Sequence, residues 1–396
     1  MGVAMSVPAE DLVLPADVRP LDGAADVDAP ALVTGASGFL GAAVAADLLE
    51  HTDEDVYCLV RPAGGTAQER VEGALRYYDL WREEWAGRVI GVAGDLARPR
   101  CGLDDADHRT LATRTGAIYH CGAGVNVSFP YDALRGANVS GTVEILRLAS
   151  TARPKRLAHV STVSVLYGRG GTDRVEDFTE LGPAGALGGY ALSKWAAEAL
   201  VAQARDRGFD ALVLRSGTLA GHARTGVSNP NDYAWLFLRT CAAMGAAPLA
   251  DSPLQWAPVD YAARAVTELT RRKNGGPEPA AYHLIAPERT RYTTLFSWMR
   301  RFGYTLRTAD FALWRKRVLD AAVESSHDGV RQIAATLPEA DRDGGTVPPD
   351  VASDRTDAVL AAAGIVCPPL DEALARTYFA AGVRRAELRP PDRPEA

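Results

Sequence analysis

The chain has 396 residues and a formal net charge of −7, with 47% hydrophobic and 23% charged residues. This length allows a large domain together with a smaller one, and the composition is that of a soluble globular protein. The acidic balance argues against a nucleic-acid-binding protein, because contacts to phosphates need a basic surface.

The cysteines and the hydropathy pattern indicate which kinds of protein and site the sequence does not suggest. The five cysteines are scattered and include no Cys-x-x-Cys pair, so the sequence suggests neither a zinc site nor a disulfide framework. No apolar run approaches the roughly 20 residues of a membrane span, and the first residues lack the features of a secretory signal. We therefore expect a cytoplasmic protein without a metal site or a membrane partner.

Short apolar strands alternate with amphipathic helices after an irregular lead-in over residues 1–28. Strands are expected at 31–34, 56–60, 89–93, 117–120, 157–161 and 211–215. Helices are expected between them at 40–50, 67–80, 105–113, 131–151 and 190–206. This alternation predicts an α/β fold of the Rossmann type, with a doubly wound parallel sheet.

The pattern changes after Arg215, where loops surround one apolar helix over 233–244. The run Ala257–Asp260 and the helix after it are expected to return to the sheet. From residue 283 the pattern is helical with breaks, and 337–354 is a candidate mobile loop. We therefore expect two domains: a nucleotide-binding domain over 29–218, to which 255–282 returns, and a smaller, mostly helical substrate domain over 219–254 and 283–396.

The most informative stretch is Thr34–Gly41, where glycines recur at three-residue spacing between the first strand and the first helix. A strand, a tight glycine turn and a helix N-terminus present backbone N–H groups to a phosphate. A plain structural turn is the alternative. The cofactor contacts expected here are Thr34, Gly35, Ser37, Gly38, Phe39, Leu40 and Gly41.

The ends of the second and third strands indicate which dinucleotide would bind. Arg61 stands where NAD-selecting folds carry an acidic residue, and an arginine accommodates the 2′-phosphate of NADPH. Arg70 in the next helix is expected to assist. Asp95, followed by Leu96, is placed to accept a hydrogen bond from the adenine amine. The alternatives are an exposed loop arginine and an aspartate that only turns the chain.

The strongest chemical signal is Tyr190 followed by Lys194 on a predicted helix. The i, i+4 spacing puts both side chains on one face. The lysine ammonium is expected to lower the pKa of Tyr190 from its usual value near 10, which would make the phenol a proton donor near neutral pH. Lys194 can also hold the nicotinamide ribose. The spacing occurs by chance in many helices, but its place after the fifth strand favours catalysis.

Polar residues near this pair complete the candidate site. A hydroxyl at the end of the fifth strand is expected to face Tyr190, with Thr162 the first choice and Ser161 the second. Ordinary strand-end capping is the alternative. Asn138 interrupts a predicted helix, in which Asn is a poor helix former. It is expected either to relay a water to Lys194 or to satisfy a local break in the backbone.

Together these residues resemble the extended short-chain dehydrogenase/reductase superfamily. More narrowly, they resemble the thioester reductase domains of nonribosomal peptide synthetases, carboxylic acid reductases and aminoadipate reductases. The resemblance runs from Asp11 to Pro368, on the motifs 34–41, 59–61, 94–95, 120–131, 138–142, 161–162, Tyr190/Lys194 and 224–232. The last of these motifs separates thioester reductases from the sugar epimerases of the superfamily.

The resemblance implies further site residues. Beside the cofactor they are Cys121, Gly122, Ala123 and Ser216, and on the substrate side Asn126 and Asp232. Two positions depart from the family pattern: Cys121 replaces an Asn, and Ser216 replaces a Pro after the arginine of the sixth strand. Both departures concern local cofactor contacts rather than the class of reaction.

The reaction implied is NADPH-dependent reduction of an acyl or peptidyl thioester on a phosphopantetheine arm. Tyr190 and Thr162 would stabilise and protonate the oxyanion, releasing an aldehyde that a second hydride could take to an alcohol. The enzyme alternatives are a fatty acyl-CoA reductase and a nucleotide-sugar epimerase or dehydrogenase. A redox-inactive module that senses the dinucleotide is the alternative outside enzymes.

The expected partner is an acyl or peptidyl carrier protein, acting in trans or within a parent synthetase, with the chain itself a monomer. Residues 289–317 hold eight basic residues against the single acid Asp310: Arg289, Arg291, Arg300, Arg301, Arg307, Arg315, Lys316 and Arg317. Such a basic surface favours docking of an acidic carrier protein. A solvated helix face is the alternative.

Overall fold

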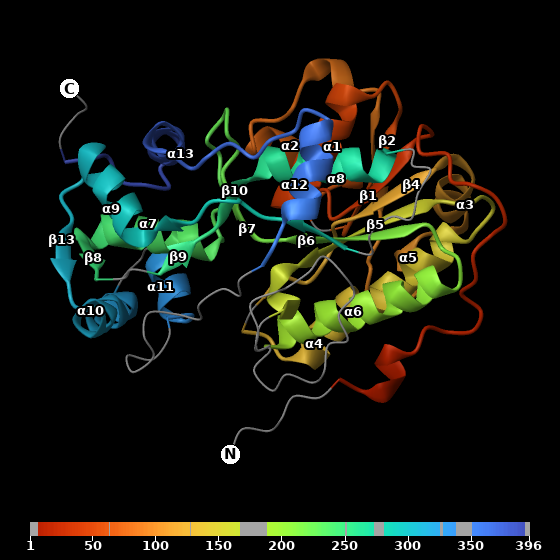
Figure 1. Cartoon of the computed structure of the whole chain (residues 1–396), viewed down its shortest axis with the longest axis horizontal. Helices are drawn as coiled ribbons and strands as arrows, with labels where there is room; N and C mark the ends of the chain where they lie inside the picture. Colours follow the sequence, from red (N-terminus) through yellow and green to blue (C-terminus); the bar gives the residue numbers. More distant parts are fainter. Residues whose placement is uncertain are drawn as a thin grey trace. The chain divides into compact units, whose positions relative to one another are not determined.

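The computed structural model describes residues 7–62, 64–126, 128–166, 188–249, 252–272, 281–324, 328–337 and 351–392. The chain divides into two compact units (Figure 1). The first comprises the described residues of Met1–Gly217, Asp260–Leu284 and Pro349–Val366, and the second those of Thr218–Val259, Ile285–Pro348 and Cys367–Ala396.

The first unit is built on a parallel seven-stranded sheet with the order β11-β6-β5-β4-β1-β2-β3. Its strands are β1 (Ala31–Thr34), β2 (Val56–Val60), β3 (Val89–Ala93), β4 (Ala117–His120), β5 (Arg156–Thr162), β6 (Ala211–Ser216) and β11 (Ala281–Leu284). Apart from the edge strand β3, the strands are buried along nearly their whole length, as expected for a parallel sheet covered on both faces. The predicted fold class is confirmed.

Helices cover both faces of this sheet. They are α1 (Phe39–His51), α2 (Ala67–Tyr77), α3 (Asp105–Arg114), α4 (Tyr131–Arg135), α5 (Gly141–Ala149), α6 (Gly189–Asp206), α8 (Val259–Arg271) and α12 (Asp354–Ala362). In Figure 1, α1, α8 and α12 lie on one face and α4, α5 and α6 on the other. Short 3-10 turns occur at Ala9–Leu12, Glu83–Trp85, Pro99–Gly102 and Val163–Leu166, and a π-helical turn at Gly136–Ser140.

The described part of the lead-in is mostly irregular, as predicted, and it packs firmly against the first unit. Leu14 and Val18 are buried in its hydrophobic core. The Asp11 carboxylate accepts hydrogen bonds from Tyr131 Oη at 2.7 Å and Arg135 Nε at 2.6 Å. These bonds tie the lead-in to the helix that follows β4.

The second unit combines helices with three two-stranded sheets, β10-β7, β12-β9 and β13-β8. Its strands are β7 (Thr218–Ala220), β8 (Ala246–Pro248), β9 (Pro253–Leu254), β10 (Trp256–Pro258), β12 (Thr290–Arg291) and β13 (Arg307–Ala309). Its helices are α7 (Tyr233–Met244), α9 (Tyr292–Arg301), α10 (Phe311–Glu324), α11 (Asp328–Ala334) and α13 (Glu372–Arg384). An aromatic core surrounds Phe237, whose ring contacts Tyr292, Phe296 and Trp314 at centroid distances of 5.0–6.1 Å.

Two features of the C-terminal half differ from the sequence-based expectation. Residues 256–258 pair with β7 rather than with the main sheet, which instead gains β11 as its seventh strand. Helix α12, expected in the substrate domain, belongs to the first unit, where His283 N–H donates to Thr356 Oγ1 at 2.9 Å. Both pairings join distant segments, which local periodicity does not reveal. Of the candidate loop 337–354, residues 338–350 lie outside the described residues.

Candidate active site

The glycine turn after β1 has the geometry of a phosphate cradle. Gly35 adopts φ +69°, and a β-carbon there would lie 2.6 Å from the Cα of Gly122. A β-carbon on Gly41 would lie 2.2 Å from the carbonyl oxygen of Gly35, so both positions require glycine. Helix α1 begins after Gly38 without a side-chain cap, which leaves its first N–H groups for an anion.

A chain of buried hydrogen bonds connects this turn to the loop after β4. Gly122 N–H donates to Thr34 Oγ1 at 3.0 Å, and Thr34 Oγ1 lies 2.8 Å from His120 Nδ1. On the other side of the ring, His120 Nε2 lies 3.3 Å from Thr142 Oγ1, whose proton goes to the Asn138 carbonyl. His120 therefore donates from Nε2 and accepts at Nδ1. Burial lowers its pKa to about 3, so the ring is neutral. The Thr34 hydroxyl thus holds the two loops together.

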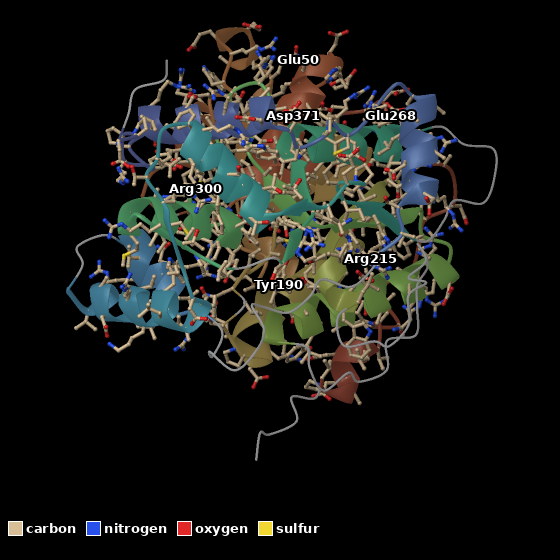
Figure 2. All side chains as sticks on the ribbon, turned by 60° about the vertical axis from the view of Figure 1, so that its left-hand side comes forward. Glu50, Tyr190, Arg215, Glu268, Arg300 and Asp371 are labelled. Atoms are coloured by element: carbon tan, nitrogen blue, oxygen red, sulfur yellow. The ribbon has the colours of Figure 1, made fainter. Side chains whose placement is uncertain are left out.

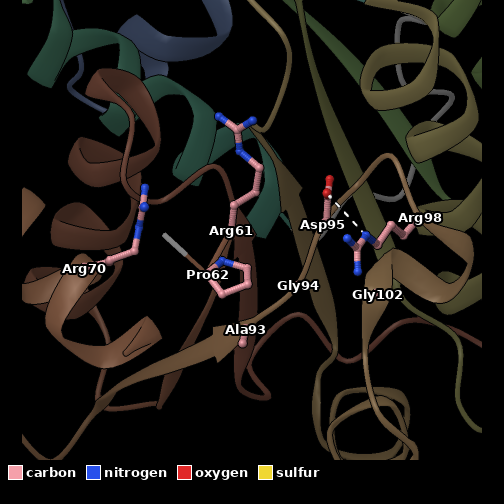
Figure 3. Close-up of a pocket in the computed structure, with 8 residues that line it drawn as sticks. All are labelled: Arg61, Pro62, Arg70, Ala93, Gly94, Asp95, Arg98 and Gly102. Atoms are coloured by element: carbon pink, nitrogen blue, oxygen red, sulfur yellow. Dashed lines mark ion pairs between the residues drawn. The ribbon is translucent and has the colours of Figure 1, made fainter. Parts of the chain in front are cut away.

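A cavity of about 450 Å³ lies at the ends of β2 and β3 (Figure 3). Its lining residues are Arg61, Pro62, Arg70, Ala93, Gly94, Asp95, Arg98 and Gly102. The structure thus brings Arg61, Arg70 and Asp95 together, as predicted. Arg98, which no sequence motif indicated, stands 3.8 Å from the Asp95 carboxylate. Three guanidinium groups against one carboxylate make this cavity suitable for an anion.

The turn after β3 explains how Asp95 and Arg98 reach the cavity. Asp95 Oδ1 accepts a hydrogen bond from Ala97 N–H at 3.0 Å, so this aspartate also turns the chain. The backbone then passes through Arg100 and Cys101 at φ 54° and 55°, a left-handed conformation that is uncommon for these residues. This turn brings the Cys101 carbonyl within 2.6 Å of Asp95 N. No local signal in the sequence indicates such a return.

Helix α6 carries Tyr190 and Lys194, and the lysine is 2% exposed. Lys194 Nζ donates to the Val160 carbonyl at 2.7 Å and lies 3.2 Å from His159 Nε2. Burial lowers the pKa of Lys194 to about 8, against the opposing influence of Glu198. The ammonium is therefore anchored to β5.

The predicted lowering of the Tyr190 pKa is wrong for this structure. Burial raises that pKa to about 12, although the hydrogen bond with Thr162 acts in the opposite direction. The physical reason is that Lys194 directs its ammonium to Val160 and His159 on β5. Tyr190 is therefore a neutral phenol at physiological pH.

The structure places Thr162, rather than Ser161, beside Tyr190. Thr162 is hydrogen-bonded to the Tyr190 side chain and accepts from Ser164 N–H at 3.2 Å. The Ser161 hydroxyl is buried and has no hydrogen-bond partner within the described part of the chain. Successive side chains of a strand point to opposite faces, so only one of the two can face Tyr190.

Asn138 lies in the π-helical turn and joins the loop after β4 to α6. Its amide accepts from Gly124 N–H at 2.6 Å and donates to the Gly124 carbonyl at 3.1 Å. It also donates to Ser193 Oγ at 2.8 Å, and Ser193 donates to the Tyr190 carbonyl at 2.8 Å. These bonds go to Gly124 and Ser193 rather than to the backbone of its own helix, so Asn138 joins distant segments. The water relay to Lys194 stays a prediction.

The remaining predicted cofactor residues follow three strands of the sheet: Leu96 after β3, Cys121, Gly122 and Ala123 after β4, and Ser216 at the end of β6. Burial raises the pKa of Cys121 to about 12, so it is a neutral thiol. Leu96 packs against Gly122: a β-carbon added to Gly122 would lie 2.7 Å from Leu96 Cδ1. Ser216 ends β6 and donates to the Gly217 carbonyl at 3.0 Å. Ala123 directly follows Gly122.

A buried ion pair that no sequence motif indicated joins α6 to β6. Arg215 on β6 is fully buried, and its Nη2 lies 2.8 Å from Glu198 Oε2 on α6. Arg215 Nη1 also lies 3.2 Å from His283 Nε2 on β11. Figure 2 labels Arg215 together with Tyr190. The pair fixes α6 to the sheet one turn after Lys194.

The two predicted substrate residues lie in different units. Asn126, in the first unit, forms a turn in which its Oδ1 accepts from Ser128 N–H at 2.9 Å. Asp232, in the second unit, caps α7 by accepting from Trp235 N–H at 3.1 Å. Burial raises the pKa of Asp232 to about 6, although backbone N–H groups of α7 oppose the shift.

Several of the basic residues over 289–317 already have partners within the second unit. Arg300 donates to the Leu306 carbonyl at 3.0 Å, and Arg301 pairs with Glu372 at 2.8 Å. Arg307 and Arg317 are exposed.

The described residues hold no cluster of three or more His, Cys, Asp or Glu side chains suited to a metal ion. No helix in those same ranges is long and apolar enough to cross a membrane.

A family model described as "Male sterility protein" matches residues 33–266, which is more than half of the chain. The chain belongs to this family. A linear gramicidin synthase polypeptide of Brevibacillus parabrevis is 36% identical to it over 94% of this chain and 7% of the relative. Isonitrile lipopeptide synthase of Streptomyces coeruleorubidus is 35% identical over 93% of this chain and 26% of the relative. The chain thus spans about a quarter or less of these curated relatives.

Solved structures agree with this assignment. The terminal R domain from the myxalamid PKS-NRPS biosynthetic pathway matches with a TM-score of 0.87 and 38% identity, over 97% of this chain and 98% of the other. The reductase domain of a nonribosomal peptide synthetase from Mycobacterium tuberculosis matches with a TM-score of 0.81 and 26% identity, over 96% and 97%. The resemblance to terminal reductase domains is confirmed. The chain is an oxidoreductase of this type, with a site for a nicotinamide dinucleotide.

Proposed function

We propose that this reductase domain uses NADPH to reduce an acyl or peptidyl thioester on a carrier protein and to release the product as an aldehyde. The observation that carries the proposal is the hydrogen bond between Thr162, at the end of β5, and Tyr190 on α6. The same helix holds the buried Lys194. These groups belong to the same unit as the glycine cradle, which supports hydride chemistry on a carbonyl.

The chain's residues fit the proposed cofactor. The turn Gly35–Gly41 would hold the pyrophosphate, because Gly35 and Gly41 keep it tight and α1 begins there without a side-chain cap. Arg61 and Arg70 would bind the 2′-phosphate that distinguishes NADPH from NADH, with Asp95 on the adenine. Leu96, Cys121, Gly122, Ala123 and Ser216 would border the nicotinamide half.

When bound, NADPH supplies the hydride that reduces the thioester carbonyl. Thr162 and Tyr190 would orient the carbonyl oxygen, and the neutral Tyr190 phenol would give its proton to the oxyanion as it forms. Lys194 would hold the nicotinamide ribose with the N–H that its two contacts on β5 leave over. The hemithioacetal hydroxyl would then return its proton to the Tyr190 phenolate as the C–S bond breaks, and the leaving thiolate would take up a proton from solvent, which gives the aldehyde and the carrier thiol. No covalent link to the enzyme is needed.

The thioester would arrive on the phosphopantetheine arm of a carrier protein, in trans or from a parent synthetase. Asn126 and Asp232 are the proposed substrate contacts. Exposed arginines of the second unit, Arg307 and Arg317, would attract an acidic carrier. An aldehyde bound again at the same site could accept a second hydride and leave as an alcohol.

Substitution of Tyr190 tests this function. With an acyl-pantetheine thioester, Tyr190→Phe should lower the rate of NADPH oxidation about 10²–10⁴-fold, because the proton donor is lost. NADPH binding, followed by fluorescence, should stay within about twofold, since the phenol is not part of the phosphate cradle. Unchanged turnover would exclude this mechanism. Epimerisation without net NADPH oxidation would favour the sugar-epimerase alternative.

A further inference from the structure

His159 is a buried histidine that the proposed mechanism does not use. It lies in the middle of β5, fully buried, in register with His120 on β4 and Val213 on β6. The two histidine rings stand 5.3 Å apart between centroids. Buried polar groups are normally hydrogen-bonded, so an imidazole at this position calls for a physical reason.

The reason lies in its contact with the lysine of α6. Lys194 Nζ is 3.2 Å from His159 Nε2 and 2.7 Å from the Val160 carbonyl. An ammonium has three N–H bonds and no acceptor. Two N–H groups of Lys194 are thus bonded to neighbouring residues of β5, and the third N–H is left for a ligand.

The direction of this hydrogen bond fixes the state of the imidazole. Because Lys194 can only donate, His159 must accept at Nε2, so its proton lies on Nδ1. Burial holds the pKa of His159 well below its usual value, and the charge of Lys194 lowers it further. The ring therefore stays a neutral acceptor. Its Nδ1 has no hydrogen-bond partner among the residues that the structure describes, a cost that packing alone does not explain.

Other titratable groups also act on Lys194. Glu198, on the same helix, and Cys121, after β4, both raise its pKa, while burial lowers it to about 8. Glu198 is itself bound by Arg215, which limits its effect. His159 therefore binds the ammonium as a neutral group on β5, whereas Glu198 acts on it as a charged group on α6.

We propose that His159 is a positioning residue for Lys194. The neutral imidazole of His159 accepts one N–H of the Lys194 ammonium and leaves another N–H for the bound nicotinamide ribose. This inference rests on the proposed function, in which Lys194 serves the reaction as an ammonium. It assigns no direct contact with substrate to His159.

A pair of variants tests the proposal. His159→Leu removes the acceptor, whereas His159→Gln retains an amide oxygen near the position of Nε2. The leucine variant should lower kcat about tenfold and move the alkaline limb of the pH profile down by about half a pH unit, because the ammonium loses an acceptor. The glutamine variant should recover most of both effects. Tyr119→Phe, which removes another buried polar atom from the neighbouring strand β4, should change neither.

The outcomes are distinguishable. Equal losses in the leucine and glutamine variants, with the alkaline limb unmoved, would assign His159 to packing and overturn the proposal. Thermal unfolding of each variant, measured with NADPH present, shows whether the fold persists. Lys194→Met tests the underlying function separately: if that variant keeps full turnover, the proposed function fails whatever His159 does.

Discussion

At the scale of single residues, the site depends on two buried groups with opposite pKa shifts. Burial raises the pKa of Tyr190 to about 12 and lowers that of Lys194 to about 8. Each shift favours the neutral form of its group. The phenol thus keeps the proton that the oxyanion needs, while the ammonium loses its own just above neutral pH, as the pH rises through about 8.

The pH dependence of turnover follows from the lysine. The active form is the ammonium, so kcat/KM should be constant below the lysine pKa and fall as the pH rises through about 8. Steady-state rates with an acyl-pantetheine thioester between about pH 6 and 10 measure this limb. Lys194→Arg, which stays charged, should remove it. A profile that is flat to the upper limit, or a limb that persists in the arginine variant, would contradict this role of Lys194.

Some residue-level features could not have been derived from the sequence. The choice between Ser161 and Thr162 depends on which face of β5 each side chain occupies, and the pKa of Tyr190 on which atoms Lys194 contacts. Arg98 lines the cavity from a turn that folds back on Asp95 through two left-handed residues, which no sequence pattern indicates. The spacing of Tyr190 and Lys194, by contrast, was sufficient to place both on one helix.

At the scale of elements, the sequence predicts the nucleotide-binding half well. Each predicted strand from 31–34 to 211–215 is present, because apolar runs bounded by turn residues are local signals. The predicted helix 131–151 is interrupted at Asn138 by a π-helical turn. Strand β11 and helix α12 escaped prediction because their places depend on contacts between distant segments.

The glycine cradle gives a test at this scale. Gly41→Ala should destabilise the domain by about 1–3 kcal/mol, because its β-carbon would meet the Gly35 carbonyl and the backbone must shift. The same shift should weaken NADPH binding, as measured by fluorescence titration. Gly73→Ala is the matched control: its β-carbon meets nothing within 4 Å on helix α2. That variant should gain about 0.5–1 kcal/mol in thermal or denaturant unfolding and bind NADPH normally.

A different result would change the assignment of the turn. If Gly41→Ala unfolds like the wild type and binds NADPH with the same Kd, the close approach to Gly35 is not needed for the cofactor. If the Gly73 control is equally impaired, the loss reflects a general intolerance of alanine.

At the scale of the whole molecule, the second unit carries the basic residues that we propose to face an acidic carrier. The chain is acidic overall, yet residues 289–317 are strongly basic. Arg300 and Arg301 are bonded within the unit, so changing them would confuse docking with folding. The exposed Arg307 and Arg317 are the better probes of a carrier-binding surface.

Reversal of these two charges tests the docking proposal. Arg307→Glu with Arg317→Glu should raise KM for a carrier-bound thioester about fivefold to twentyfold, because like charges repel an acidic carrier. The kinetics with a free acyl-pantetheine should not change. Arg109→Glu, an exposed position on α3 in the first unit, is the control. An equal loss with both substrates would mean that the reversed charges disturb the domain itself.

Transfer of the nicotinamide hydride to the thioester carbon tests the account most directly. NADPH dideuterated at the nicotinamide C4 and an equal amount of unlabelled NADH would be supplied with a carrier-bound acyl thioester. We expect mass spectrometry to find an aldehyde with one deuterium at C1, and one free carrier thiol for each NADPH oxidised. An unlabelled aldehyde, or thiol release without NADPH oxidation, would contradict the assignment of this chain as an NADPH-dependent thioester reductase.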